Sequence, residues 1–372
     1  MSASAEKRIH VVIDNITTGG GIERVCSVLL PMLAREARVR VLGLLDNTAE
    51  TVYDFEGVEI VPLLSGQKSA EVGQGGYLRL LSKAFANIRK DRPDIVLYLT
   101  MGRLSVFAAP FVMKDRLASK HTRHIACEHI AFSSHSGAIT RLKRLALPRY
   151  DRVVFLTARD LDNFSERRRL LHIPNPSPFT TIAEPRSAVQ EKLALGVGRL
   201  TAQKGFDMLI PAWKAFVERH PDWKLLIVGE GEDRESLTRL IREHQLETHC
   251  ELYGNSRDIG ALYRRADLML MPSRFEGLPM TLIEAQAHAL PIVAFDCETG
   301  PREIVTDGED GFLVPAFDQP AFAEAIARAA EPTRYPALSA AAARSAERFD
   351  REQILRHWQS LFESLETPTP RR

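Results

Sequence analysis

Short apolar runs alternate with longer amphipathic stretches along most of the chain. The run at 9–13 precedes a stretch at 22–37 whose apolar residues recur with helical spacing. Apolar runs without polar alternation are typical of strands buried on both faces of a parallel sheet. In the first half, the same alternation predicts strands at 39–45, 58–61, 94–99, 123–129 and 151–156, and helices at 77–90 and 105–113.

The alternation stops in a proline-rich segment at 176–190 and then begins again. The second half contains predicted strands at 193–200, 223–228, 250–253, 267–271, 291–295 and 311–314, and predicted helices at 206–220, 234–244, 259–266, 319–330, 336–347 and 353–366. Two such alternations joined by a linker favour an α/β protein with two doubly wound, Rossmann-like domains. Their ligand crevices are expected to open into one interdomain cleft.

The composition restricts the class of protein but does not indicate a function. The 372 residues suit two domains, and contents of 45% hydrophobic and 26% charged residues are ordinary for a soluble globular protein. No apolar run approaches the ~20 residues that span a bilayer, and the N-terminus lacks the apolar region of a secretory signal. The cysteines are too scattered for a zinc site or a disulfide scaffold, so we expect a cytoplasmic protein.

The net charge of +1 conceals an asymmetry. Residues 1–180 contain 26 Lys and Arg against 18 Asp and Glu, a net charge of +8, whereas the remainder has 23 against 30, a net charge of −7. A basic half indicates an anionic partner or a membrane surface, although drift in surface composition gives the same result. The segment 140–149 is basic and amphipathic, and it could lie on an anionic membrane or be a solvated helix. Nothing indicates nucleic acid.

The stretch 273–287 carries the most chemical information. It follows the predicted strand at 267–271, turns at Gly277 and Pro279, and continues as a largely apolar helix. Glu276 therefore lies in the loop, and Glu284 lies one turn inside the helix. Free N–H groups at the helix start can bind an anion. Alone, this stretch could also be a capped helix with one satisfied core carboxylate.

A second loop at the end of a strand offers cations. Arg199 and Lys204 flank the turn that follows the strand beginning at 193. Two fixed cations at a strand's carboxyl end can clamp a diphosphate. The alternative is a pair of surface cations.

The N-terminal half has a weaker candidate site. Gly19, Gly20 and Gly21 lie between a strand and a helix, which is a phosphate-binding arrangement, but the spacing is not that of a nicotinamide site. The cluster can also be just a tight turn. His129 follows Glu128 at the end of the strand at 123–129, so both are predicted to point toward a cleft.

Metal-binding patterns are not convincing. Asp160 and Asp162 have D-x-D spacing, but they lie at what looks like a helix start, where we interpret them as capping residues. The histidines form no ligand spacing that we accept as a metal site; they include His121, His124 and His135.

Together these segments resemble the retaining, nucleotide-sugar-dependent glycosyltransferases of family 4, which have the two-domain GT-B fold. Gly198-Arg199-Leu200 with Lys204-Gly205 looks like the family's G-R-L-x(3)-K-G segment, and Glu276-Gly277-Leu278-Pro279 with Glu284 looks like its E-G-x-P-x(4)-E motif. Thr299 to Ile304, Gly311 to Val314, Asn175 and the glycine loop also resemble family segments. The resemblance is strong over 195–315 and weaker over 40–125.

The resemblance implies the organisation of the chain and the roles of its residues. Residues 1–178 would bind the acceptor, 179–350 would bind the donor, and 351–372 would supply a helix that packs back on the first domain, with a frayed tail. Arg199 and Lys204 would bind the diphosphate, Glu276 the sugar and Glu284 the ribose, while His129 would lie near the transferred sugar. The remaining donor-binding residues implied are Gly20, Gly21, Gly198, Gly229, Asn255, Gly277, Leu278, Pro279, Met280, Thr281 and Leu282.

The implied reaction moves a hexose or N-acetylhexosamine from a nucleoside diphosphate sugar, by default a UDP-sugar, to a glycan or polyprenyl-diphosphate-linked acceptor. Two cations and a helix N-terminus can neutralise the leaving diphosphate, so no metal and no other cofactor is expected. Because no second carboxylate nucleophile is evident, retention would arise by same-face displacement. The enzyme would act in the cytoplasm or on the inner face of the cytoplasmic membrane.

Three other functions stay open at this point. A sugar-nucleotide epimerase of the same architecture would need no acceptor. A phosphorylase would need a pyridoxal lysine, which no segment marks. A non-catalytic nucleotide-sugar-binding protein would keep Arg199 and Lys204 without requiring Glu276.

Overall fold

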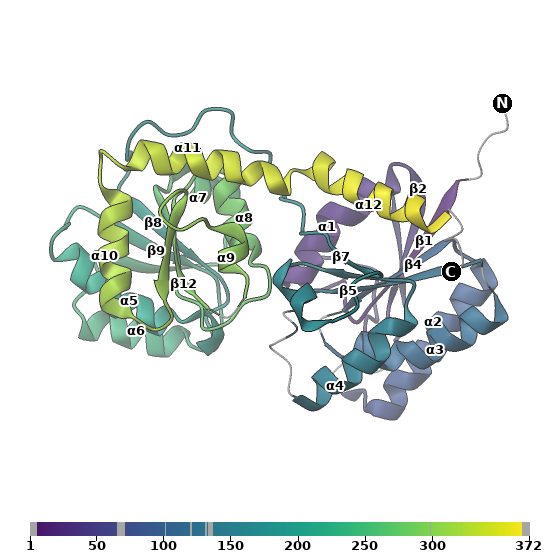
Figure 1. Ribbon diagram of the computed structural model, residues 1–372. Helices are drawn as coiled ribbons and strands as arrows, with labels where there is room; N and C mark the ends of the chain where they lie inside the picture. Colours follow the sequence, from purple (N-terminus) through teal and green to yellow (C-terminus); the bar gives the residue numbers. More distant parts are fainter. Residues whose placement is uncertain are drawn as a thin grey trace. The chain divides into compact units, whose positions relative to one another are not determined.

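Strands and helices alternate through two compact units of the computed structural model (Figure 1). It describes residues 6–64, 71–100, 102–119, 121–130, 132, 137–297 and 299–366. Unit 1 comprises 1–178 and 351–372, and unit 2 comprises 179–350. These cut points lie at the residues expected for the domain boundaries.

Unit 1 is built on a parallel sheet of seven strands in the order β3-β2-β1-β4-β5-β6-β7. The strands are β1 (Lys7–Ile13), β2 (Ala37–Gly43), β3 (Val58–Pro62), β4 (Ile95–Thr100), β5 (Arg123–Glu128), β6 (Arg152–Phe155) and β7 (Leu170–His172). The helices are α1 (Gly21–Ala34), α2 (Gln74–Asp91), α3 (Leu104–Ala118), α4 (Gly137–Ala146) and α12 (Arg351–Glu366), with 3-10 turns η3 (Leu147–Arg149) and η4 (Arg159–Asn163).

Helices bury both faces of this sheet. Ile9, Val11 and Ile13 of β1 share a core cluster with α1 and α12, whereas Val12 packs in a second cluster with α2 and α3. Alternate residues of a strand point to opposite faces, so a run without polar residues fits a sheet covered on both sides. The final helix α12 belongs to unit 1 because its apolar residues at helical spacing, from Ile354 to Leu365, join the α1 side of this core.

Unit 2 has a six-stranded parallel sheet in the order β10-β9-β8-β11-β12-β13. The strands are β8 (Leu193–Val197), β9 (Lys224–Val228), β10 (Cys250–Gly254), β11 (Leu268–Met271), β12 (Ile292–Asp296) and β13 (Gly311–Pro315). The helices are α5 (Phe206–Val217), α6 (Arg234–Glu243), α7 (Ile259–Arg265), α8 (Met280–Ala287), α9 (Pro301–Ile304), α10 (Gln319–Ala330) and α11 (Tyr335–Ala346), with 3-10 turns η5 (Ala202–Lys204) and η6 (Glu347–Phe349).

Strand order reverses once in each sheet, between β1 and β4 in unit 1 and between β8 and β11 in unit 2. Loops that leave neighbouring strands in opposite directions at such a point form a crevice at the carboxyl edge, where open α/β sheets bind ligands. The two loops with candidate chemistry, 198–205 and 272–279, follow β8 and β11 and therefore flank the reversal in unit 2.

Two local predictions were wrong. The strand β7 was not predicted, because a three-residue strand directly after an arginine run gives too little pattern. At Asp160 the structure has a five-residue 3-10 helix, η4, with Asp160 and Asp162 in its first turn; its N-cap is Ala158 and supplies no side-chain bond, so the predicted capping role was wrong. Asp160 instead accepts hydrogen bonds from the Phe132 N–H (2.9 Å) and the Thr157 hydroxyl (2.7 Å), so it joins two loops.

Candidate functional site

The loops after β8 and β11 are in direct contact at the strand reversal of unit 2. Gly205 has a φ of +69°, and a Cβ at this position would collide with the carbonyl oxygen of Pro272. Glycine permits both the left-handed conformation and the close approach. The Arg274 N–H donates to the Gln203 carbonyl at 2.8 Å, and the Gln203 amide donates to the Phe275 carbonyl at 3.1 Å. The two loops therefore form one structural element.

An ion pair at the edge of this element fixes it further. The Arg274 guanidinium donates to both carboxylate oxygens of Asp207 at 2.8 and 2.7 Å, and also to the Ala202 carbonyl at 2.7 Å. The hydrogen bonds from Arg274 hold the pKa of Asp207 below its ordinary value. A bidentate pair of this kind restricts both side chains, so the loops present a defined surface.

Glu276 lies at the centre of the joined loops. Its Oε1 accepts hydrogen bonds from the Lys204 ammonium at 2.6 Å and from the Ser273 hydroxyl at 2.7 Å. The side chain of Glu276 is 7% exposed and that of Lys204 is 17% exposed. The Glu276 carbonyl accepts from the Thr299 hydroxyl at 2.5 Å. A cation and a carboxylate from segments 72 residues apart thus meet at one point that solvent still reaches.

The glycines predicted as donor-binding residues have packing roles in this arrangement. Gly229 has a φ of +143°, and a Cβ there would collide with the Gly198 carbonyl. A Cβ at Gly198 would lie 3.1 Å from the Lys204 side chain. Gly277 is in contact with Gly300, where a Cβ would meet the Gly277 carbonyl. These glycines bring the loops together, whatever else they contact.

Two other predicted residues at this edge are open to solvent. The side chain of Arg199, directly after Gly198, is exposed and makes no hydrogen bond or ion pair with the residues that the structure describes. Asn255 is exposed directly after β10. Arg199 therefore presents an exposed cation at the same loop as the Lys204–Glu276 pair.

The helix α8 begins beside this pair with an open N-terminus. Pro279 is its N-cap and supplies no side-chain cap, and the first turn contains no acidic residue. The Thr281 hydroxyl is buried and has no hydrogen-bond partner among the described residues. Free N–H groups and a buried hydroxyl at a helix start suit an anion or a sugar hydroxyl. Leu278 is buried against the loop, Met280 and Leu282 lie in the first turn, and Glu284 follows at 5% exposure.

In unit 1 the glycine loop after β1 differs from an open phosphate cradle. A Cβ at Gly20 would collide with the carboxylate of Glu23, which is buried in the first turn of α1 and accepts a hydrogen bond from the Thr18 hydroxyl. A carboxylate already lies at this helix N-terminus, where it complements the dipole. Gly21 has open space around it. The simple interpretation of this loop as an anion site is therefore not supported at Gly20.

His129 lies directly after β5, and its N–H donates to the Thr100 carbonyl at 2.9 Å. The residue is 9% exposed, and burial lowers the pKa of its imidazole to about 4. The ring makes no hydrogen bond within the described part of the chain. His129 is therefore a neutral group at pH 7 that can exchange hydrogen bonds with a bound molecule.

Both carboxylate oxygens of Glu128, the neighbour of His129, have partners within the protein. It accepts hydrogen bonds from the Ser105 hydroxyl at 2.7 Å and from Lys143 of α4, and both charged side chains are sealed from solvent. Burial raises the pKa of Glu128, which Lys143 opposes. The ion pair between Lys143 and Glu128 was not predicted from the sequence. Lys143 was predicted to belong to a basic surface segment, and Glu128 was expected to face a cleft.

The other polar residues singled out from the sequence have structural partners. His124 is buried between Tyr98 at 2.9 Å and Asp115 at 3.2 Å, and His121 lies 3.3 Å from Asp94. Asp162 pairs with Arg167 on the surface at 2.6 Å. His135 lies outside the described residues. No group of three or more His, Cys, Asp or Glu within the described ranges is arranged to hold a metal ion.

Two residues important to this site had no sequence signal. Ser273 supplies a hydrogen bond to Glu276, and Tyr263 of α7 donates to Glu284 at 3.0 Å. Serine after a strand and tyrosine in an amphipathic helix are too common to be selected without the tertiary structure.

Comparison with known proteins places these motifs in a family. Residues 179–346 match the family described as "Glycosyl transferases group 1". The chain is 33% identical over 368 residues to "Amylovoran biosynthesis glycosyltransferase AmsD" of Erwinia amylovora, an alignment that covers 95% of this chain and 99% of that protein.

Solved structures share the fold at low sequence identity. Anabaena Alr3699/HepE, crystallised with UDP and glucose, superposes with a TM-score of 0.76 at 19% identity, covering 96% of this chain and 100% of that one. The pneumococcal O-GlcNAc transferase GtfA, crystallised with UDP and GlcNAc, gives a TM-score of 0.75 at 14% identity, covering 97% and 99%. Two Rossmann-like domains of this kind constitute the GT-B fold.

Proposed function

The chain belongs to the group 1 glycosyl transferases, and from this membership we propose that it transfers a hexose or N-acetylhexosamine from a UDP-sugar to a glycan or lipid-linked glycan in the synthesis of a surface polysaccharide or glycoconjugate. The relative in Erwinia amylovora is named for amylovoran biosynthesis, and the two structural neighbours were crystallised with UDP. These names support the proposed acceptor class and the proposed nucleotide.

The observation that carries the proposal is the contact between Lys204 and Glu276 beside the open N-terminus of α8. Lys204 and the exposed Arg199 supply positive charge for a diphosphate, and the first N–H groups of α8 add partial positive charge. Glu276 is proposed to accept hydrogen bonds from the sugar, and Glu284 from the ribose hydroxyls. The segment from Gly277 to Thr281 contributes backbone N–H groups, except at Pro279, which has none.

The proposed reaction keeps the anomeric configuration. The acceptor hydroxyl oxygen forms a bond to the anomeric carbon on the face from which the diphosphate oxygen leaves, and the hydroxyl proton moves to that leaving oxygen. Negative charge grows on the diphosphate as its bond breaks, and Arg199, Lys204 and α8 stabilise it. On this account no divalent ion is needed. His129, neutral at pH 7, is proposed to hydrogen-bond a sugar hydroxyl.

The acceptor is proposed to be lipid-linked because α4 has a suitable surface. Leu142 and Leu145 are 50% and 62% exposed, and Arg141 and Arg144 are exposed beside them. An apolar edge next to a basic edge fits an anionic membrane surface. No helix among the described residues is long and apolar enough to cross a bilayer.

Membrane binding can be tested with vesicles of anionic and of neutral lipid. Wild-type protein should float with anionic vesicles in low salt, and Leu142→Glu with Leu145→Glu should remove the binding. Leu78→Glu, at a comparably exposed position in α2, is the matched control. Equal flotation of all three proteins with neutral vesicles would contradict the electrostatic part of the proposal.

The enzymatic proposal is tested by incubating the purified protein with UDP-sugars, with and without a glycan extract, in buffer containing EDTA. Transfer should require the extract and survive EDTA, while Lys204→Ala and Glu284→Gln should each reduce it by about 10²-fold or more. Conversion of the nucleotide sugar without an acceptor would instead identify an epimerase. Full activity of both variants would refute the assigned donor site.

A further inference from the structure

The buried carboxylate of Glu284 is held from a second helix. Tyr263 of α7 donates its hydroxyl proton to Glu284 Oε2 at 3.0 Å, and the same hydroxyl lies 3.4 Å from the Thr281 carbonyl of α8. Tyr263 is completely buried. A charged group in an otherwise apolar helix segment needs such a partner. The contact fixes one carboxylate oxygen relative to the start of α8.

Aromatic packing fixes the phenol in turn. The Tyr263 ring stacks on the His288 imidazole with a centroid separation of 5.2 Å and an interplanar angle of 26°. Phe179 places its ring edge-on to both, at 6.0 and 4.7 Å. His288 Nδ1 bonds to the Glu284 carbonyl at 2.8 Å, so the stack is attached to the helix that carries the carboxylate. These ring contacts hold the phenol on the side of Glu284.

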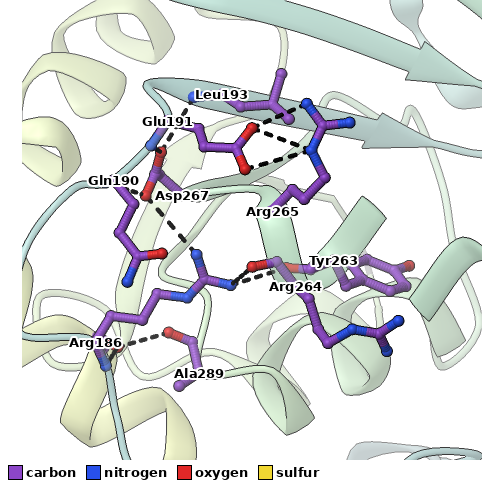
Figure 2. Close-up of polar contacts among 10 residues, drawn as sticks. Arg186, Gln190, Glu191, Leu193, Tyr263, Arg264, Arg265, Asp267 and Ala289 are labelled. Atoms are coloured by element: carbon purple, nitrogen blue, oxygen red, sulfur yellow. Dashed lines mark hydrogen bonds and ion pairs between the residues drawn. The ribbon is translucent and has the colours of Figure 1, made fainter. Parts of the chain in front are cut away.

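Figure 2 shows what holds the helix that carries Tyr263. Arg186 Nη2 donates to the carbonyls of Tyr263 and Arg264, at 2.9 and 2.8 Å, at the C-terminal end of α7. The cation thereby satisfies carbonyls that the helix leaves without an internal partner. Arg186 also lies 3.8 Å from Asp267, which accepts backbone N–H bonds from Gln190 (2.8 Å) and Glu191 (3.0 Å). The segment that precedes β8 is therefore fastened to α7 and to the start of β11.

We propose that Tyr263 is a positioning residue for nucleotide recognition: its hydroxyl orients the Glu284 carboxylate toward the ribose diol, and the Arg186 contacts keep Tyr263 in place. The proposal rests on the role given above to Glu284. Tyr263 does not touch the nucleotide in this account. It acts through Glu284, because a diol is bound well only by a carboxylate held in one orientation before binding.

The test compares ribose discrimination in matched variants. The nucleotide is whichever of UDP, GDP and ADP raises the melting temperature of the wild-type protein most, so that the proposed uridine does not affect the outcome. Its affinity and that of its 2′,3′-dideoxy analogue are measured by titration calorimetry for wild type, Tyr263→Phe, Glu284→Gln and Tyr98→Phe. Tyr98 of unit 1 is as completely buried as Tyr263, and its hydroxyl likewise bonds to a side chain, His124 Nδ1, at 2.9 Å.

Tyr263→Phe should weaken the ribonucleotide about tenfold and the dideoxy analogue less than twofold, raising the donor KM while leaving kcat nearly unchanged. Tyr98→Phe should leave both affinities unchanged. Equal weakening of both ligands by Tyr263→Phe would show a merely structural role and overturn the proposal, with Glu284 still able to discriminate. If Glu284→Gln keeps the wild-type preference for ribose, the assigned role of Glu284 is wrong, and the proposal for Tyr263 falls with it.

Discussion

Each unit contains a lysine–glutamate pair at the carboxyl edge of its sheet, and the two pairs have nearly the same chemistry. In unit 1, Glu128 accepts from Ser105 and Lys143; in unit 2, Glu276 accepts from Ser273 and Lys204. They differ in access. The side chains of Lys143 and Glu128 are 0% and 1% exposed, whereas those of Lys204 and Glu276 are 17% and 7% exposed.

This difference in solvent exposure distinguishes a pair that stabilises the fold from a pair that can bind a substrate. A sealed pair can only hold α4 against β5, because nothing can exchange with it. The Lys204–Glu276 pair lies where solvent reaches it, at the strand reversal and beside the open start of α8. A diphosphate and a sugar hydroxyl can take up hydrogen bonds from such a pair without unfolding either loop.

The largest effect is expected from breaking the sealed pair. Lys143→Met leaves the Glu128 carboxylate buried without its cation, which should lower the free energy of unfolding by about 3–5 kcal/mol in urea titrations. Adding Glu128→Leu should restore most of this loss, because the uncompensated charge is gone. A single variant as stable as wild type would contradict the assignment of this pair to the fold.

Glu276→Gln, in the solvent-accessible Lys204–Glu276 pair, should lower the rate of sugar transfer. The amide is nearly isosteric but has lost its charge, so transfer should fall by about 10²–10³-fold, equivalent to about 3–4 kcal/mol in the barrier. The melting temperature should change by less than about 3 °C. Steady-state kinetics and thermal unfolding on one preparation check both. Loss of stability in proportion to activity would count against a substrate role.

The pH dependence should come partly from buried histidines. Burial lowers the pKa of His129 and of His10 from 6.5 to about 4. Between pH 6.5 and pH 4 these imidazoles bind protons in the unfolded chain and not in the folded chain. Their contribution to the free energy of unfolding is therefore fully present above pH 6.5 and is lost as the pH falls toward 4. In His129→Gln, the free energy of unfolding should fall by about 2 kcal/mol less between pH 7 and pH 4.5 than in the wild type, as measured by urea titrations across this range. An unchanged slope would contradict the burial of a neutral imidazole.

The smallest effect is expected at the ion pair that joins the site loops. Arg274→Ala removes the bidentate contact with Asp207 at the partly exposed edge of the site. It should cost about 1 kcal/mol in stability and a few-fold in donor KM, with kcat unchanged. Arg219→Ala removes a surface contact with Glu324 elsewhere in unit 2 and is the control. A large fall in kcat would mean that Arg274 takes part directly in the reaction.

Much of the fold was predictable because buried parallel strands are apolar throughout and their helices have regular apolar spacing. The predicted strand at 267–271 and the structural strand β11 differ by one residue, and such agreement is typical of unit 2. β7 escaped prediction because Leu170–His172 is too short to show a period. The capping role predicted for Asp160 was wrong, because its carboxylate accepts from the Phe132 N–H, a contact that spacing does not reveal.

The residues of the candidate site could be selected from sequence motifs, but the contacts between them could not be predicted. Glu276, Glu284, Arg199 and Lys204 were selected from their places after strands, but the bond between Lys204 and Glu276 joins residues 72 positions apart. Lys143 shows the limit most clearly, because a lysine in a basic amphipathic segment gives no sign that it points inward to Glu128. Tyr263 was invisible for the same reason: its role depends on the packing of α7 against α8.

The most direct test of the difference between the two pairs is one measurement made on two matched variants, Lys204→Met and Lys143→Met. The melting temperature of each is recorded with and without a saturating nucleoside diphosphate. We predict that Lys204→Met melts within about 3 °C of wild type and loses most of the ligand-induced increase, whereas Lys143→Met melts much lower and keeps that increase while folded. The opposite pattern, with Lys204→Met unstable and still responsive to nucleotide, would contradict the account.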